Sequence, residues 1–95
     1  MSDPLQLKII LPEASVPPRP IKGINVPATD GRLTVLAGHQ PIVVALVEGD
    51  AIITTMDGTR ETWTLSAGAL QMENNTASLL VTKATLKGDG AKSGE

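Results

Sequence analysis

The sequence predicts an all-β fold, specifically a small antiparallel β-sandwich of two packed sheets. Apolar residues recur mostly at every second position, and turn-forming pairs separate these runs every several residues. No run shows a sustained helical period of apolar residues with caps. With 95 residues, the chain has room for one small domain. Parallel pairing would need long helical crossovers, so we expect the strands to pair antiparallel.

The first strand is expected over Leu5–Leu11. Its odd-numbered residues are apolar and share one face, whereas Gln6 and Lys8 lie on the other face. Pro12 ends the strand because proline lacks the N–H group that a ladder needs. The proline-rich segment Val16–Pro20 then predicts an extended connector with polyproline character.

The second strand is expected over Ile21–Val26, with Ile24 and Val26 facing inward. Pro27–Gly31 is predicted as a loop, and it contains the tight-turn pair Asp30-Gly31. The next strand therefore starts directly after this pair.

This short strand over Arg32–Leu36 leads into the loop Ala37–Pro41. Ile42–Val47 is then continuously apolar, which is typical of a strand that is covered on both faces. An exposed patch that meets a partner is the alternative interpretation. Gly49-Asp50 ends the run.

Asp57-Gly58 is the strongest hairpin signal, and it is flanked by the predicted strands Ala51–Met56 and Thr59–Leu65. A two-residue turn of this kind requires positive φ at both centres, which Asp and Gly tolerate. Trp63, the only aromatic residue, alternates in step with Leu65, so we expect it in or beside the core. The expected register pairs Met56 with Thr59 and Ile52 with Trp63.

Ala69–Met72 and Thr76–Val81 are the last predicted strands, and the polar turn Glu73–Asn75 joins them. The composition then becomes polar and rich in glycine. Each interior glycine costs a helix ~1 kcal/mol relative to alanine, so a helix is not expected there. We therefore expect a β-sandwich domain over residues 1–85 and a disordered polar tail over residues 86–95.

Composition argues against several classes of partner. The net charge is -2, so no basic patch suggests nucleic acid or an anionic membrane. One aromatic residue leaves little on which bases or sugars could stack. No stretch approaches the ~20 apolar residues of a membrane span, so we expect no direct membrane insertion, and any membrane association must come through a partner.

The sequence offers little equipment for catalysis. There is one histidine and no cysteine, which removes thiolate nucleophiles and sulfur metal sites. His39, Ser66 and an aspartate could be drawn as a triad, but nothing specifies that they meet. No metal-ligand spacing or phosphate loop is present, so we expect no metal and no cofactor.

Two loop features have both a structural and a functional interpretation. His39, between glycine and proline neighbours, is expected to hydrogen-bond the local backbone, with an interface role as the alternative. Asp30-Gly31-Arg32 is either a turn with a solvated arginine or a loop tip that meets a partner.

Three segments carry a resemblance to a known family. Val26–Ile42 contains a turn, a strand and the loop Gly38-His39-Gln40-Pro41, and Leu65–Met72 follows at a matching spacing. The opening strand includes Leu7–Ile10. Together these segments resemble the N-terminal β-sandwich domain of the epsilon subunits of F-type ATP synthases, over roughly Leu5–Ala84. The Gly-His-x-Pro loop with both of its flanks is the most specific part of the resemblance.

Several positions depart from the family pattern. Arg32 stands where the family usually carries Glu, and Leu33 and Ala69 replace frequent Phe residues. These changes indicate a divergent branch whose core is repacked in aliphatic residues. The family usually continues into two helices that inhibit the catalytic head and that bind ATP in some members. The chain ends soon after its last strand, so neither property is expected here. Alanine replaces the usual Gly, Pro and Gly at Ala28, Ala37 and Ala67.

The resemblance implies a non-catalytic rotor subunit in the central stalk of an F-type ATP synthase. Such a subunit docks on the gamma subunit and on the c ring, and it helps to couple ion-driven rotation to ATP synthesis. It lies at the cytoplasmic face of a bacterial plasma membrane, peripheral through the complex. The implied c-ring contacts are Thr29, Asp30, Gly31 and Arg32, and the implied gamma contacts are His39, Pro41, Val44, Ser66 and Gln71.

Two other functions stay open. The first is a free-standing β-sandwich adapter that works outside the synthase. The second is a small-ligand-binding or enzymatic β-barrel, which would need a cavity lined by convergent polar groups.

Overall fold

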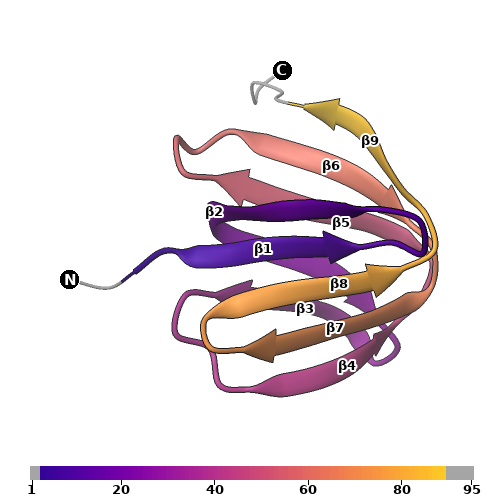
Figure 1. The fold of residues 1–95 in the computed structure, drawn as a ribbon, viewed down its shortest axis with the longest axis horizontal. Helices are drawn as coiled ribbons and strands as arrows, with labels where there is room; N and C mark the ends of the chain where they lie inside the picture. The colour runs from indigo at the N-terminus through magenta and orange to yellow at the C-terminus, as the bar shows by residue number, and fades with distance from the viewer. Residues whose placement is uncertain (1–2, 90–95) are drawn as a thin grey trace.

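The computed structural model describes residues 3–89, and in this range all regular structure is β-strand. The strands stack in two layers, as Figure 1 shows, so the predicted all-β sandwich is confirmed. The elements are β1 (Leu5–Ile10), β2 (Ser15–Ala28), β3 (Gly31–Leu36), β4 (Ile42–Leu46), β5 (Gly49–Thr55), β6 (Arg60–Leu65), β7 (Gly68–Glu73), β8 (Thr76–Val81) and β9 (Ala84–Asp89).

Strand β2 contributes to both layers. It is 14 residues long, and its first half pairs with β1 whereas its second half pairs with β3 and β5. The first layer comprises β1, β8, β7 and β4 together with the first half of β2. The second layer comprises β3, β5, β6 and β9 together with the second half of β2.

The predicted polyproline connector at Val16–Pro20 is wrong, because these residues form the first half of β2. Their ladder partner is β1, with Arg19 opposite Leu7 and Val16 opposite Ile9. The register shifts between Leu7 and Ile9, so the intervening prolines fall in a bulge. At this edge of the sheet a missing N–H group breaks no ladder bond, and proline is therefore tolerated.

One strand pair is parallel, contrary to the expectation that all pairs are antiparallel. β1 runs parallel to β8, with Lys8 opposite Ser78 and Ile10 opposite Leu80. A parallel pair needs a long connection, and a helical crossover is the usual one. Here the strands between β1 and β8 supply that connection, so no helix is required.

The hairpin of β5 and β6 forms where predicted, but its register differs by one residue. Trp63 lies opposite Ala51, not opposite Ile52. The loop is longer than a two-residue turn and ends at Gly58, whose φ is 91°. The Asp57 carboxylate accepts hydrogen bonds from the Thr55 hydroxyl and the Thr59 amide, at 2.5 and 3.0 Å. These bonds lower the pKa of Asp57 to about 2.

The remaining turns are tighter than expected. β2 continues to Ala28, which lies opposite Gly31, so the predicted loop at 27–31 is reduced to a turn at Thr29 and Asp30. Asn74 and Asn75 join β7 to β8 with φ values of 53° and 58°. Positive φ at both central residues is the requirement of a type I′ hairpin turn, which asparagine accepts more readily than most residues.

Strand β9 extends beyond the predicted domain boundary at residue 85. Leu86 lies opposite Trp63 and Gly88 lies opposite Thr62, so residues 86–89 belong to the sandwich. The free edge of β6 supplies backbone hydrogen bonds that do not depend on side-chain type, and Lys87 Nζ also lies 3.0 Å from Asp50 Oδ2. The rest of the predicted tail, residues 90–95, lies outside the described residues.

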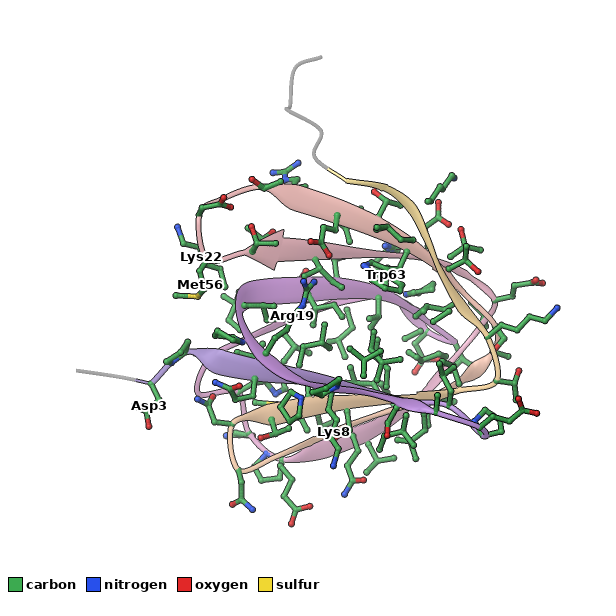
Figure 2. The ribbon with its side chains drawn as sticks, turned by 45° about the horizontal axis from the view of Figure 1, so that its top comes forward. Asp3, Lys8, Arg19, Lys22, Met56 and Trp63 are labelled. Carbon is green, nitrogen blue, oxygen red and sulfur yellow. The ribbon has the colours of Figure 1, made fainter. Side chains whose placement is uncertain are left out.

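The core between the layers is aliphatic, with Trp63 half-buried against it (Figure 2). Ile24 and Val26 face inward and are buried, as predicted. No polar or charged side chain is buried among the described residues. The buried core residues are Leu5, Leu7, Ile9, Ile21, Ile24, Val26, Val35, Leu46, Ala51, Ile53, Leu65, Leu70, Met72, Ala77, Leu79 and Val81.

An ion pair links the layers at the open edge of the sandwich. Arg19, in the first half of β2, places Nη2 2.5 Å from Oε1 of Glu61 on β6. The Trp63 indole also donates a hydrogen bond to this carboxylate, at 3.1 Å. The hydrogen bonds from Arg19, with a smaller contribution from Trp63, lower the pKa of Glu61 although partial burial opposes them.

We predict that Glu61→Gln lowers the free energy of unfolding by about 1 kcal/mol at pH 7, because it removes a partly shielded ion pair. The lowered pKa means that the stabilisation is fully present above the ordinary value of 4.5 and is lost as pH falls through the folded-state pKa. Urea unfolding at pH 7 and pH 3 measures this. The difference between the parent and the variant should be larger at pH 7 than at pH 3, and an equal difference at both values would contradict the prediction.

We also predict that β9 contributes to stability. A chain shortened to residue 85 should melt several degrees below one shortened to residue 89, because it loses the ladder with β6. A loss of 1 kcal/mol corresponds to about 4–8 °C in a domain of this size. Thermal unfolding followed by Trp63 fluorescence provides the measurement. Equal melting temperatures would show that β9 adds nothing to the sandwich.

Candidate functional site

The turns gather at two opposite ends of the sandwich (Figure 1). One end, which we call the Arg32 end, holds the Thr29–Arg32 turn, together with Ser66 and the connection from β8 to β9. The other end, which we call the Asn75 end, holds the Gly38–Pro41 loop and the Asn74–Asn75 turn. The contact residues implied by the family resemblance are thus divided between two ends.

The Thr29–Arg32 turn is exposed at the Arg32 end. Thr29, Asp30 and Gly31 are all solvent-accessible, and Gly31 has a φ of 118°, which favours glycine. The Thr29 amide donates to the Ala45 carbonyl at 3.1 Å, so the turn is tied to the end of β4. The turn is therefore exposed, carries short polar side chains, and is fixed in position by its hydrogen bond to β4.

Arg32 is neither a freely solvated side chain nor an outward-reaching tip. Its Nε donates to Asn25 Oδ1 at 2.6 Å, and its Nη2 donates to the Asp50 carbonyl at 2.8 Å. The guanidinium therefore lies across the outer face of the second layer and joins β3, β2 and β5. Arginine suits this role because its planar fork donates in several directions at once.

The prediction that His39 hydrogen-bonds the local backbone is confirmed. Its Nδ1 lies 2.8 Å from the Gln40 carbonyl, and its amide donates to the Leu36 carbonyl at 3.1 Å. The ring is half-buried, whereas Pro41 in the same loop is exposed. These bonds fold the loop back on itself as it leaves β3.

Strand β4 is not covered on both faces, so that prediction is wrong within this chain. Val44 faces the core, and Val43 on the other face is 70% exposed. Side chains alternate across a strand, so the family-derived contact at Val44 falls on the inner face. The outward-facing neighbour Val43 is the more exposed of the two, whereas Val44 is partly buried against the core.

An apolar row crosses the outer face of the first layer. Ala45 lies opposite Ala69, which lies opposite Leu80, and Leu80 lies opposite Ile10. Leu80 is 39% exposed although it belongs to a strand in the middle of the layer. We call these four residues the apolar row.

A second row lies beside the apolar row; it is polar except for Val43, and it includes a predicted contact residue. Gln71 on β7 lies between Val43 and Ser78 in the register. The Gln71 amide donates to Glu73 Oε1 at 3.0 Å. Pro41, Val43 and Gln71 also line a shallow groove of about 440 Å³ at the Asn75 end. Two predicted gamma contacts, Pro41 and Gln71, therefore share one surface feature.

Ser66 lies away from that groove, and its hydroxyl is hydrogen-bonded within the chain. Its hydroxyl accepts from the Thr82 and Lys83 amides, at 2.9 and 3.2 Å, and donates to the Ala67 carbonyl at 3.1 Å. β7, with six residues, separates Ser66 from the groove, which corresponds to about 20 Å of strand. A partner would have to compete for a hydroxyl that is already satisfied.

Sequence reasoning missed Asn75, whose side chain makes three hydrogen bonds to two other segments at the Asn75 end. Its side chain donates to the Asp3 and Pro4 carbonyls and accepts from the Gly38 amide. The sequence pattern predicted only that Asn75 lies in a turn. It gave no indication of the hydrogen bonds, because Asp3, Pro4 and Gly38 are distant from Asn75 in the sequence. Asn25 was missed because its side-chain partners, Thr34 and Arg32, lie on the neighbouring strand β3, and residue periodicity does not show such bonds.

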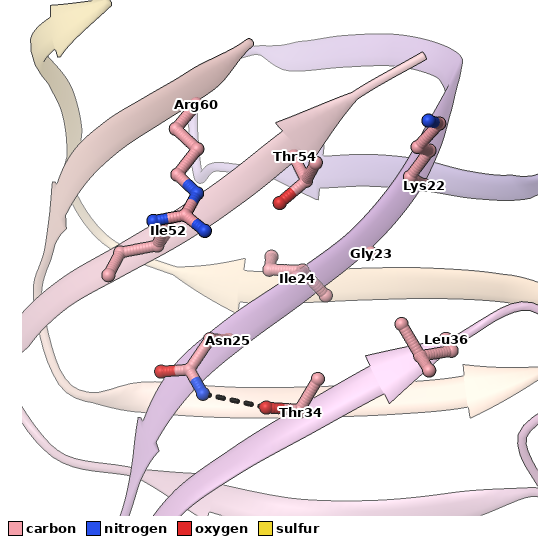
Figure 3. A pocket seen from close by; sticks show the side chains of 9 residues that line it. All are labelled: Lys22, Gly23, Ile24, Asn25, Thr34, Leu36, Ile52, Thr54 and Arg60. Carbon is pink, nitrogen blue, oxygen red and sulfur yellow. Dashed lines mark hydrogen bonds between the residues drawn. The ribbon is translucent and has the colours of Figure 1, made fainter. Parts of the chain in front are cut away.

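A separate hollow of about 320 Å³ opens on the outer face of the second layer (Figure 3). Ile24, Ile52 and Leu36 contribute apolar lining, and the Asn25 amide is already bonded to the Thr34 hydroxyl at 2.8 Å. None of the predicted contact residues lines it. The hollow is therefore distinct from the groove at the Asn75 end.

Within residues 3–89, no group of three or more histidine, cysteine and acidic side chains could hold a metal ion. The same part of the chain has no helix that is long and apolar enough to span a membrane.

Comparison with known proteins identifies similar domains. A family model described as the β-sandwich domain of the ATP synthase delta/epsilon chain matches residues 4–87. The ATP synthase epsilon chain of Paracoccus denitrificans is 29% identical over 80 residues, which cover 84% of this chain and 54% of the relative. The epsilon chain of a Synechococcus strain is 31% identical over 80 residues, covering 84% and 58%. The chain thus spans little more than half the length of the curated relatives it matches.

Solved structures share the fold. A chain of the Euglena gracilis mitochondrial ATP synthase, in a structure of OSCP, F1 and the c ring, gives a TM-score of 0.83 at 18% identity, over 90% of this chain and 54% of that chain. A chain of the central stalk and c ring from the Tetrahymena thermophila mitochondrial enzyme gives 0.72 at 12% identity, over 88% and 68%. At these identities the likeness shows the fold alone.

We predict that Arg32→Ala lowers the free energy of unfolding by about 1 kcal/mol, because Arg32 bonds two neighbouring strands from an exposed position. Arg60→Ala is the matched control, since the Arg60 guanidinium has no hydrogen-bond partner among residues 3–89. Urea denaturation of the two variants and the parent provides the comparison. If both variants were equally stable, the hydrogen bonds of Arg32 would add nothing to stability, and its side chain would behave as a solvated one.

Proposed function

Because this chain belongs to the ATP synthase delta/epsilon chain family of β-sandwich domains, we propose that it is a non-catalytic subunit of the central stalk of an F-type ATP synthase. In this role it docks on the gamma subunit and on the c ring. It helps to couple ion-driven rotation to ATP synthesis, and it needs no cofactor. It sits at the cytoplasmic face of a bacterial plasma membrane and is held there through the complex.

The single observation that carries this proposal is the exposed apolar row on the first layer. The outward face of an antiparallel sheet that meets water normally carries polar side chains. Here the apolar row is continuous across four strands, and Val43 beside it is 70% exposed. Contiguous exposed apolar residues are common at protein interfaces, and this supports the proposal.

The surroundings of the apolar row suit a protein partner. Protein interfaces have an apolar centre and a polar rim that carries hydrogen bonds. The neighbouring row supplies Gln71, Ser78 and Lys8 as such a rim. The groove that contains Pro41 lies at one end of the same face. We assign this face to the gamma subunit, with Val43 in place of Val44.

The Thr29–Arg32 turn is our proposed contact with the c ring. It is exposed at the Arg32 end and offers the polar side chains of Thr29 and Asp30. Arg32 supports the turn by bonding Asn25 and the Asp50 carbonyl, so its contribution to the contact is chiefly to hold the backbone in place.

The test is a pull-down of the tagged chain from solubilised membranes, with the gamma and c subunits identified in the eluate. Recovery of both supports the rotor role, and recovery of neither favours the free-standing adapter.

We predict that Leu80→Glu lowers the affinity for the gamma subunit by about tenfold or more, because it places a charge in the apolar row. Leu36→Glu is the matched control: the same substitution at a residue that is 57% exposed on the second layer. Calorimetric titration of each folded variant with purified gamma subunit gives the affinities. Equal affinities in the two variants would move the docking face away from the first layer.

A further inference from the structure

We propose that Asn75 is a positioning residue that sets the geometry of the Gly38–Pro41 loop and thereby shapes the groove for the gamma subunit. The inference rests on the proposed function for the identity of the partner. It adds a residue on a different hairpin, one that neither the family resemblance nor the apolar row identifies.

The backbone of Asn75 places its side chain toward the loop. Asn74 and Asn75 turn β7 into β8, with Glu73 opposite Thr76. The φ of 58° at Asn75 lies in the left-handed region, which most residues avoid and which glycine, asparagine and aspartate accept. The backbone conformation alone therefore favours glycine, asparagine or aspartate at position 75, before any hydrogen bond of the side chain is considered.

The Asn75 side chain is bonded to two other segments. Nδ2 donates to the Pro4 carbonyl at 3.0 Å and to the Asp3 carbonyl at 3.2 Å. Oδ1 accepts from the Gly38 amide at 2.9 Å. The Asn75 carbonyl also accepts from the Gln6 amide at 3.0 Å. An amide provides two donors and an acceptor on one short side chain, which is the set that these partners need.

The bond to Gly38 matters because Gly38 lies where the chain crosses between the layers. Gly38 has a φ of 83°, and after it the chain passes from β3 in the second layer to β4 in the first. Pro41, three residues later, lines the groove together with Val43 and Gln71. The hydrogen bond between the Gly38 amide and Asn75 thus holds the beginning of the β3–β4 connection against the first layer.

Substitutions at Asn75 can separate the backbone from the side chain. Asn75→Gly keeps the left-handed backbone and removes all three side-chain bonds. Asn75→Asp keeps an acceptor for the Gly38 amide but loses the donors to Asp3 and Pro4. Asn74→Gly changes the same turn at a φ of 53°, where the side chain makes none of these bonds, and it serves as the control for the backbone.

The first measurement is hydrogen exchange of the Gly38 amide by NMR. We expect exchange at least tenfold faster in Asn75→Gly than in the parent, and a much smaller change in Asn75→Asp and Asn74→Gly. Unchanged exchange in Asn75→Gly would overturn the proposal, because the loop would then be held without Asn75.

The second measurement is the affinity for purified gamma subunit at a temperature where every variant is folded. Asn75→Gly should bind about tenfold more weakly. Glu61→Gln, which removes the ion pair at the open edge, controls for loss of stability and should bind like the parent. Faster exchange at Gly38 with unchanged affinity would reduce Asn75 to a structural role. If the parent bound no gamma subunit, the proposed function would fail, whereas the exchange result would still decide whether Asn75 holds the loop.

Discussion

Strand β2 runs through both layers, and this crossing constrains the position of the other strands. Its two halves must both turn apolar residues toward one core, and Ile21 and Ile24 are both buried. A strict alternation would put these two on opposite faces, so a register shift between Ile21 and Gly23 is needed. Glycine fits at the shift because a Cβ on Gly23 would lie 2.7 Å from Leu36 Cδ2, which could move aside, and 3.3 Å from the Val35 carbonyl oxygen, which could not do so easily.

The fold class and most of the inward-facing residues could be predicted because alternation reports burial directly. Leu5, Leu7 and Ile9 were expected on one face, and all three are buried. The details that could not be predicted depend on backbone geometry. The prolines of β2 are allowed only because that half lies at an edge, and the hairpin register depends on the length of the loop that ends at Gly58. Neither the edge position of this half of β2 nor the length of the β5–β6 loop can be read from the order of apolar and polar residues.

The surroundings of the proposed contact residues could not be predicted, because a family resemblance gives positions in the sequence but not the orientations of side chains. Val44 and Val43 differ by one position and face opposite sides of β4. Ser66 is bound by the Thr82 and Lys83 amides, and Arg32 is bound by Asn25 and Asp50. These bonds join different strands or connections, so periodicity and local turn chemistry carry no information about them.

The two proposed contact regions are mechanically connected through β4. The Thr29 amide bonds the Ala45 carbonyl at the Arg32 end, and the groove begins beside Ile42 at the Asn75 end. Between them, β4 is hydrogen-bonded to β7 along its length, from Ile42 to Leu46. A load applied at the turn would therefore be carried by a paired strand and not by a flexible loop. This arrangement suits the proposed role, in which the domain would pass force between two partners, and the hydrogen bonds that tie down the turns at both ends add to the stiffness.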